Sequence, residues 1–97
     1  MKIDFIKENG VLTVAPDGRL DTVTAPALES FLGEQYQAEE QLVINCEKLC
    51  YISSAGLRVL LAAQKKSKGN MKLTGVCELV MEVFEITGFT DVLTIEQ

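Results

Sequence analysis

The sequence predicts a single α/β domain over residues 1–97, with a mixed and mostly parallel sheet of about five strands and helices packed against it. A chain of 97 residues is long enough for one hydrophobic core and too short for two. Near the N-terminus two strand-like runs are joined by Asn9-Gly10, a strong signal for an antiparallel hairpin. Beyond them strand-like runs alternate with helical patterns, which is typical of parallel strands. The expected order is β-β-α-β-α-β-α-β.

Short local patterns predict the hairpin and the first helix. Residues 2–6 alternate apolar and polar side chains, and residues 11–15 are β-branched and apolar. Pro16-Asp17-Gly18 predicts a bend or bulge, after which Arg19-Leu20-Asp21 completes the second strand. A helix then begins, with Thr24 as a candidate N-cap and Pro26 in its first turn. Its apolar face comprises Leu28, Phe31, Leu32 and Tyr36.

A buried strand followed by a helix forms the centre of the chain. Leu42-Val43-Ile44 has no helical period and predicts a strand covered on both faces, which the chain leaves through residues 45–50. A helical pattern runs from Ala55 to lysines that suit the negative end of a helix, and Gly69 fits a left-handed position after it. Ser53 or Ser54 is therefore expected at the N-cap or in the first turn. The apolar stripe comprises Leu57, Val59, Leu60, Leu61, Ala62 and Ala63, and the lysines are Lys65, Lys66 and Lys68.

The remaining segments complete the alternation of strands and helices. Residues 33–41 are polar and predict a surface connection, and residues 71–76 predict a strand with Met71, Leu73 and Gly75 on one side. A helix follows and is expected to stop at Gly88, and residues 92–95 predict the last strand. On that helix one face carries Glu78, Glu82 and Glu85, and the other carries Leu79, Val80, Val83, Phe84 and Ile86.

Charge and composition argue against several classes of partner. A net charge of −5 and a pI near 4.6 disfavour nucleic acid and anionic membranes, because both reward a concentrated positive patch. No apolar run approaches the ~20 residues that span a bilayer, and the N-terminus lacks the pattern of a signal peptide. We therefore expect a cytoplasmic protein without membrane insertion. The acidic surface and the lack of a heptad pattern favour a monomer.

The cysteines and the missing histidines argue against a metal site. Cys46, Cys50 and Cys77 fit reduced thiols in a cytosolic protein and are expected to be small buried hydrophobic side chains. Zinc would need further ligands, and the chain contains no histidine. We expect neither a metal nor a cofactor.

The parts of an active site are also missing. Without histidine there is no Ser-His or Cys-His nucleophile pair. The chain has neither of the glycine-rich loops that bind nucleotide phosphates, and Ser53-Ser54-Ala55-Gly56 lacks the flanking glycines of a nucleophile elbow. These absences favour a binding module over an enzyme.

A serine at a helix N-terminus has two possible roles. Its hydroxyl can cap the helix, which contributes about 1 kcal/mol. Alternatively it can carry a phosphoryl group, which gains the same free N–H groups and the positive end of the helix dipole. The physical pattern alone leaves both roles open.

The segment Tyr51-Ile52-Ser53-Ser54-Ala55-Gly56-Leu57 resembles the signature of the STAS domain of bacterial anti-sigma factor antagonists. In that family an aspartate precedes the serine that is phosphorylated, and a Gly-Leu pair follows. Ser54 matches the phosphorylated serine, and Ser53 stands where the family commonly has aspartate. The resemblance implies that Ser54 is the phosphoacceptor, with Ser53 as the alternative because it offers a second hydroxyl.

Two further segments carry the same resemblance, which thus covers essentially the whole chain. Residues 18–28, GRLDTVTAPAL, are similar to the family's Gly-x-Leu-Asp-x-x-Thr-Ala motif, in which the aspartate lies near the phosphorylated serine. Asp21 is on that basis a neighbour of Ser54, although it is equally suited to capping the helix that follows. Residues 83–93 are similar to the family's last helix and its glycine step.

The resemblance implies a function in partner switching. An unphosphorylated antagonist of this family binds an anti-sigma factor, which is a serine-protein kinase of the histidine-kinase-like ATPase type, and displaces the sigma factor. Phosphorylation of the serine by that partner ends binding, and a phosphatase would restore it. The residues expected at the partner surface are Asp21, Ser53, Ala55, Gly56, Leu57 and Arg58.

Several alternatives stay open at this stage. Leu57 is either a core residue or an apolar contact beside the serine, Gly56 would allow close approach of a partner, and Arg58 would pair with a partner carboxylate. A different function is that of a STAS adaptor subunit in a transporter, cyclase or sensor complex, which no kinase modifies. Nucleotide binding at the helix N-terminus is a third possibility.

Overall fold

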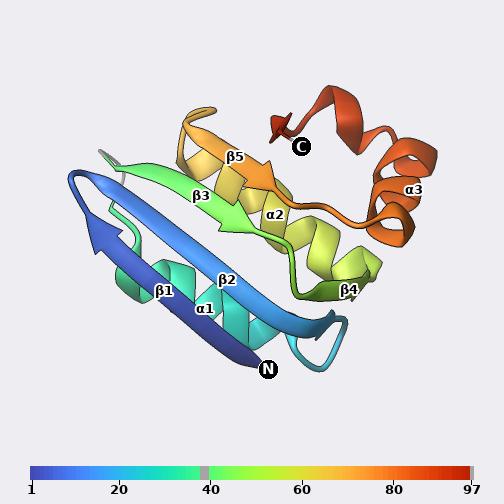
Figure 1. The fold of residues 1–97 in the computed structure, drawn as a ribbon, viewed down its shortest axis with the longest axis horizontal. Helices are drawn as coiled ribbons and strands as arrows, with labels where there is room; N and C mark the ends of the chain where they lie inside the picture. The colour runs from blue at the N-terminus through green and yellow to red at the C-terminus, as the bar shows by residue number, and fades with distance from the viewer. Residues whose placement is uncertain (38–39, 97) are drawn as a thin grey trace.

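A computed structural model of the chain, which describes residues 1–37 and 40–96, confirms the α/β class (Figure 1). The sheet has six strands in the order β1-β2-β3-β5-β6, with β4 paired to β2 outside this row. The strands are β1 Lys2–Glu8, β2 Val11–Leu20, β3 Gln41–Asn45, β4 Leu49–Ile52, β5 Met71–Thr74 and β6 Ile95–Glu96. The helices are α1 Ala25–Gln35, α2 Ser54–Lys66, α3 Glu78–Thr87 and the short 3-10 helix η1 Phe89–Asp91.

The predicted hairpin is confirmed. β1 pairs antiparallel with β2, and the pair closes at Glu8 and Val11 around Asn9 and Gly10. Asn9 and Gly10 have positive φ angles of 53° and 75°. A two-residue turn needs such angles to match the twist of the two strands that it joins. The pairs β2–β3, β2–β4, β3–β5 and β5–β6 are parallel, so the sheet is mixed and mostly parallel, as expected.

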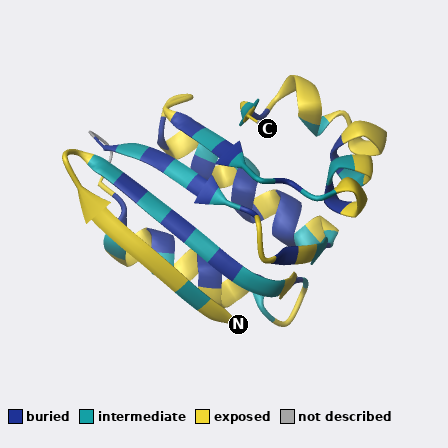
Figure 2. Ribbon diagram, viewed as in Figure 1, coloured by how far each residue is buried: buried dark blue, intermediate teal, exposed yellow. Residues whose placement is uncertain are grey.

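The core lies between the sheet and helices α1 and α2, which are behind the strands in Figure 1. Along the central strands buried and partly buried residues alternate, which Figure 2 shows as bands of two colours. Val14, Ile44 and Leu73 form one buried row across the sheet, whereas the adjacent row of Thr13, Val43 and Lys72 is only partly buried. The prediction that residues 42–44 are covered on both faces was therefore wrong, because α1 and α2 cover one face.

Strand β2 is long enough to serve two parallel partners. Val11 to Val14 pair with β3, and Gly18 to Leu20 pair with β4. The register shifts between Gly18 and Arg19, and Gly18 has a φ of 106°, which confirms the predicted irregularity in this segment. The prediction that the chain leaves the sheet throughout residues 45–50 was wrong, since β4 begins at Leu49.

The connection after α1 is less exposed than predicted. Tyr36 and Glu40 are buried, and the Tyr36 hydroxyl donates a 2.9 Å hydrogen bond to the Glu40 carbonyl oxygen. The Glu40 carboxylate lies 3.3 Å from Lys7 Nζ on β1. The prediction of a surface connection was thus wrong for Tyr36 and Glu40. Residues 38–39 of the predicted segment lie outside the described ranges.

The C-terminal segment differs from its prediction in two places. On α3 only Val80 and Phe84 are buried, whereas Leu79 and Ile86 are 52% and 84% exposed, so the predicted apolar face was too wide. The helix ends at Gly88, as expected, with a φ of 79°. The last strand is not residues 92–95 but β6, because the chain first forms η1 and only then reaches the edge of β5.

Candidate functional site

The turn that carries the two serines is held at the end of the sheet by β2 and β4. Arg19 pairs with Tyr51 and Leu20 with Ile52 in the parallel register. The Ser53 N–H then donates a 2.9 Å hydrogen bond to the Leu20 carbonyl oxygen. Because Asp21 directly follows Leu20, this pairing places Asp21 at the same end of the sheet as the turn before α2.

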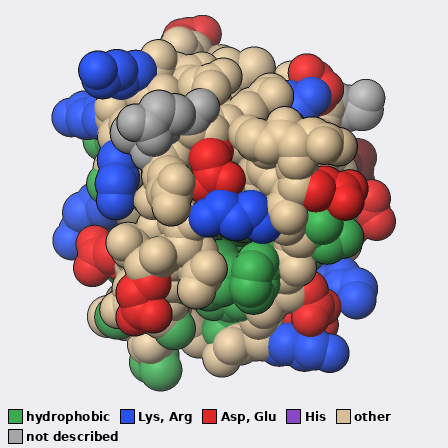
Figure 3. Space-filling model, turned by 90° about the vertical axis from the view of Figure 1, so that its left-hand side faces the viewer, with side chains coloured by type: hydrophobic (Ala, Val, Ile, Leu, Met, Phe, Trp, Pro, Cys, Tyr) green, Lys and Arg blue, Asp and Glu red, His purple; other side chains and the backbone are tan. Residues whose placement is uncertain are grey.

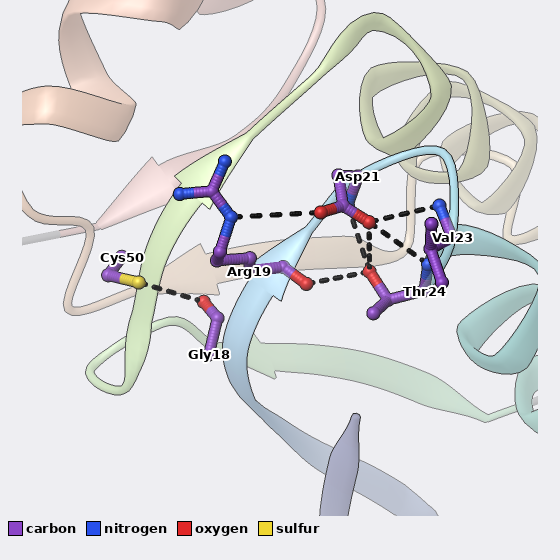
Figure 4. A network of polar contacts seen from close by, with 6 residues as sticks. All are labelled: Gly18, Arg19, Asp21, Val23, Thr24 and Cys50. Atoms are coloured by element: carbon purple, nitrogen blue, oxygen red, sulfur yellow. Dashed lines mark hydrogen bonds and ion pairs between the residues drawn. The ribbon is translucent and has the colours of Figure 1, made fainter.

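Asp21 organises the turn between β2 and α1 (Figure 4). Its Oδ1 accepts hydrogen bonds from the Val23 and Thr24 N–H groups at 3.0 and 3.1 Å. The Thr24 hydroxyl accepts the Asp21 N–H at 2.9 Å and donates to the Arg19 carbonyl oxygen at 2.6 Å. Thr24 is at the N-cap position of α1, as predicted, but its side chain bonds back to the turn and does not cap the helix. Asp21 thus stabilises the turn before α1 through its side chain.

The carboxylate of Asp21 is stabilised as an anion by this turn. The pKa of Asp21 lies below its ordinary value of 3.8, chiefly because the Thr24 N–H donates to the carboxylate. Partial burial opposes this effect, while Val23, the Thr24 hydroxyl and the guanidinium of Arg19 act in the same direction as the Thr24 N–H. Arg19 Nε is 3.7 Å from Asp21 Oδ2. A fixed negative charge therefore lies beside the serine turn.

The two serines have different environments. Ser53 is the N-cap of α2, but its hydroxyl caps nothing, and its Oγ is buried without a hydrogen-bond partner among the described residues. Ser54 is the first residue of α2 and is exposed. Leu57 N–H donates to the Ser53 carbonyl oxygen at 2.9 Å, so the N–H groups of residues 54–56 precede the first intrahelical bond. Of the two serines, Ser54 is the exposed one, and the Ser53 hydroxyl oxygen is buried.

The other expected partner residues divide between surface and interior. Arg58 is exposed and Ala55 is partly buried. Gly56 and Leu57 are buried, with Leu57 only 6% exposed, so Leu57 is a core residue. A Cβ at Gly56 would lie 2.8 Å from side-chain carbons of Leu20 and Ile52, which gives this glycine a packing role inside the domain.

A hollow of about 200 Å³ lies beside the turn, between the start of α1 and the start of α2. It brings Ala55 and Arg58 together with residues of the Asp21 turn and of α1. Its lining comprises Thr22, Ala25, Pro26, Glu29, Ala55, Arg58 and Val59. The hollow therefore places Ala55 and Arg58 of the predicted site next to the turn that contains Thr22.

Strand β4 contributes side chains that were not predicted for the site. The Arg19 guanidinium carbon lies 4.1 Å from the centre of the Tyr51 ring, a cation–π contact that holds the arginine beside Asp21. Cys50, also on β4, is exposed, and its thiol donates to the Gly18 carbonyl oxygen at 3.3 Å. Cys50 and Tyr51 stand together between the buried Leu49 and Ile52, so these four residues have no alternating pattern that would reveal the strand from sequence.

The prediction that the cysteines are buried was correct for only one of the three. Cys46 is fully buried, Cys77 is partly buried, and Cys50 is exposed. Within residues 1–37 and 40–96 no group of three or more His, Cys, Asp or Glu side chains is placed to hold a metal ion. In the same ranges no helix combines the length and apolar character needed to cross a membrane.

Comparison with protein families and curated relatives points to one family. The STAS domain model matches residues 2–97. A protein of Bordetella bronchiseptica described as a candidate anti-sigma factor antagonist, BtrV, is 36% identical over 99 residues, which cover 98% of this chain and 85% of that protein. The anti-sigma-B factor antagonist of Listeria monocytogenes is 32% identical over 84 residues, which cover 81% of this chain and 73% of that protein.

Solved structures share the fold. A candidate anti-sigma factor antagonist from Thermotoga maritima superposes with a TM-score of 0.90 at 15% identity, covering 98% of this chain and 86% of that one. The phosphorylated form of SpoIIAA from Bacillus superposes with a TM-score of 0.72 at 14% identity, covering 99% and 92%. With a family model matched over residues 2–97 and relatives above 30% identity, the chain belongs to the STAS domain family.

Proposed function

We propose that this protein is an anti-sigma factor antagonist whose binding to a kinase-type anti-sigma factor is switched off by phosphorylation of Ser54. The observation that carries the choice of residue is the contrast between the two serines. Ser54 is exposed at the start of α2, whereas the Ser53 hydroxyl oxygen is buried. A kinase can reach the Ser54 hydroxyl without unfolding the turn.

The proposed modification is a transfer from ATP. Ser54 Oγ forms a bond to the γ-phosphorus as the bond from that phosphorus to the bridging oxygen breaks. ADP leaves, and a base of the kinase takes the hydroxyl proton. The product carries about −1.5 to −2 charges at the helix end where the dipole and the free N–H groups favour an anion. The domain should therefore stay folded after modification.

The switch acts on the complex. The unmodified partner surface comprises the exposed part of the site, which is Ser54, Ala55, Arg58 and the turn of Asp21. In a complex shaped for a hydroxyl, a phosphoryl group beside the Asp21 carboxylate meets repulsion and a desolvation cost. A loss of about 2.8 kcal/mol lowers affinity a hundredfold, which suffices for release.

The partner and its setting follow from this chemistry. The anti-sigma factor must bind ATP and phosphorylate serine, and a phosphatase must remove the phosphate for a new cycle. The resemblance to the family implies that this kinase is of the histidine-kinase-like ATPase type. ATP and sigma factors place the cycle in the cytoplasm. The chain itself acts as the binding partner and phosphoacceptor and catalyses no reaction.

The test is mass spectrometry after incubation with ATP and each histidine-kinase-like anti-sigma factor of the same genome. One phosphate on Ser54, absent in Ser54→Ala and retained in Ser53→Ala, is the expected result. Ser54→Ala should bind the same anti-sigma factor persistently, and Ser54→Asp should bind it about a hundredfold more weakly. Phosphate on Ser53 would move the site. No phosphate with any active kinase, together with a stable complex of another kind, would favour the adaptor function.

A further inference from the structure

Strand β1 is an open edge of the sheet. Among the described residues it pairs only with β2, and it is the last strand of the row. Phe5 and Ile6 on this strand are 46% and 61% exposed. Figure 3 faces this side of the molecule and shows hydrophobic side chains gathered between basic and acidic ones. A strand of seven residues, with exposed apolar side chains and an unpaired edge, is a surface for strand addition.

The hairpin register determines which backbone groups face outward. A two-residue turn closes on a hydrogen-bonded pair, here Glu8 and Val11, and hydrogen-bonded pairs alternate with non-bonded ones along an antiparallel ladder. The backbone groups of Glu8, Ile6, Asp4 and Lys2 are therefore directed to β2. Those of Ile3, Phe5 and Lys7 point away from the sheet and are open to a new strand.

We propose that two copies of this chain pair through β1, antiparallel and centred on Phe5, to form one continuous sheet. In this register Phe5 faces Phe5 of the second copy, and Ile3 faces Lys7. All outward N–H and C=O groups of both strands then find partners. At each end of the paired strands, Lys2 of one copy faces Glu8 of the other. These are non-hydrogen-bonded pairs, in which the side chains lie closer together, so each dimer contains two contacts between opposite charges.

The other registers are less favourable. In a two-fold symmetric pairing that keeps the helix-covered faces on the same side, odd-numbered residues face odd-numbered residues and even-numbered residues face even-numbered ones. The register can therefore change only by moving the centre of the pairing from Phe5 to a neighbouring residue. A shift one way places Asp4 opposite Asp4, and a shift the other way places Asp4 opposite Glu8. Both shifts bring acidic side chains together and leave outward backbone groups of Ile3 or Lys7 unpaired. The charges along β1 thus select the register centred on Phe5.

This pairing is compatible with the site at Ser54. Strand β2 lies between β1 and β4, and Ser54 follows β4. None of the residues of β1 lines the hollow beside the serine turn, so a dimer presents two open sites. The monomer expected from the sequence rested on net charge and the lack of heptads. Strand pairing needs no heptads, and in this register it sets opposite charges against each other locally although both copies are acidic.

The test is sedimentation of the purified chain over a range of concentrations, with charge-reversal variants. We expect a concentration-dependent dimer whose dissociation constant rises at least about tenfold in Lys2→Glu and in Glu8→Lys. The double variant, which restores opposite charges across the interface, should recover to within about threefold. Lys65→Glu is the matched control for Lys2→Glu, because it changes net charge by the same amount at the end of α2.

The double variant also separates the interface from effects within one copy. Lys2 faces Asp17 on β2, so Lys2→Glu introduces a repulsion inside the hairpin. This repulsion remains in the double variant, and Lys65→Glu measures the effect of net charge, so recovery of the dimer beyond that effect reports the contact between copies. A wild-type chain that stays monomeric at all concentrations, an equal loss in Lys65→Glu, or no recovery in the double variant would each overturn the proposal.

Discussion

The Ser53 N–H and the Leu20 carbonyl oxygen are joined by a 2.9 Å hydrogen bond that links the end of β2 to the turn before α2. The same carbonyl oxygen lies 2.9 Å from the position that a Cβ on Gly56 would occupy. The turn that presents Ser54 therefore rests directly on the strand that leads into Asp21, with no room for a side chain between them.

The close packing at Gly56 predicts that Gly56→Ala is destabilising. In an open helix this change stabilises by about 0.5–1 kcal/mol. Here the methyl group would lie 2.8 Å from carbons of Leu20 and Ile52 and within 3 Å of the backbone, so we expect a net loss of about 1–3 kcal/mol. Urea denaturation measures the change. Gly33→Ala is the control, because a Cβ there meets nothing within 4 Å and should stabilise.

The unpartnered hydroxyl of Ser53 predicts an unusual response to Ser53→Ala. Removing an N-cap serine ordinarily costs about 1 kcal/mol. Since Ser53 makes no cap bond and its Oγ is buried, we expect a change within about 0.5 kcal/mol, or a gain. Thr24→Ala should instead cost about 1–2 kcal/mol, because the Thr24 hydroxyl makes hydrogen bonds at 2.6 and 2.9 Å. A normal loss in Ser53→Ala, measured by the same denaturation, would show that the hydroxyl caps α2 in solution.

Features set by single residues could be predicted from the sequence, whereas features set by packing could not. Local chemistry was sufficient for the turn at Asn9-Gly10 and for the helix stop at Gly88, because positive φ is a property of single residues. The position of Asp21 near the serine turn came from family resemblance. The burial of the Ser53 hydroxyl depends on packing between β2 and α2, which no local pattern reports.

The same reason explains the missed strand and the misassigned faces. Strand β4 has four residues and is recognisable only through its pairing with β2. The period of α3 predicted an apolar face that was too wide, because it could not show that on this helix only Val80 and Phe84 would be buried. Contact partners distant in sequence decide both features.

The lowered pKa of Asp21 predicts a defined pH dependence of stability. A carboxyl whose folded pKa lies below its unfolded value stabilises the fold above the unfolded value, and this contribution is lost as the pH falls through the folded pKa. We expect wild type to be more stable than Asp21→Asn near neutral pH. The difference should shrink as the pH falls from about 5 to below 3.8. Denaturation of both variants across this range is the measurement, and a difference independent of pH would contradict the assignment.

The three cysteines are predicted to react with thiol reagents in a fixed order. Cys50 is exposed on β4 and should react first. Cys77 is partly buried and donates to the Leu49 carbonyl oxygen at 3.6 Å, so it should follow more slowly. Burial, with the neighbouring Cys77 thiol, raises the pKa of Cys46 to about 12, so almost none of it is thiolate at pH 8.

The measurement is the time course of labelling by a chromogenic disulfide at pH 8, with and without denaturant. Cys50→Ser should lose the fast phase and leave the slower ones, because the other two thiols lie on different segments. In denaturant all phases should merge, since the unfolded chain exposes every thiol equally. Fast labelling of Cys46 in the folded protein, identified by peptide mass spectrometry, would show that the core at the end of β3 opens readily.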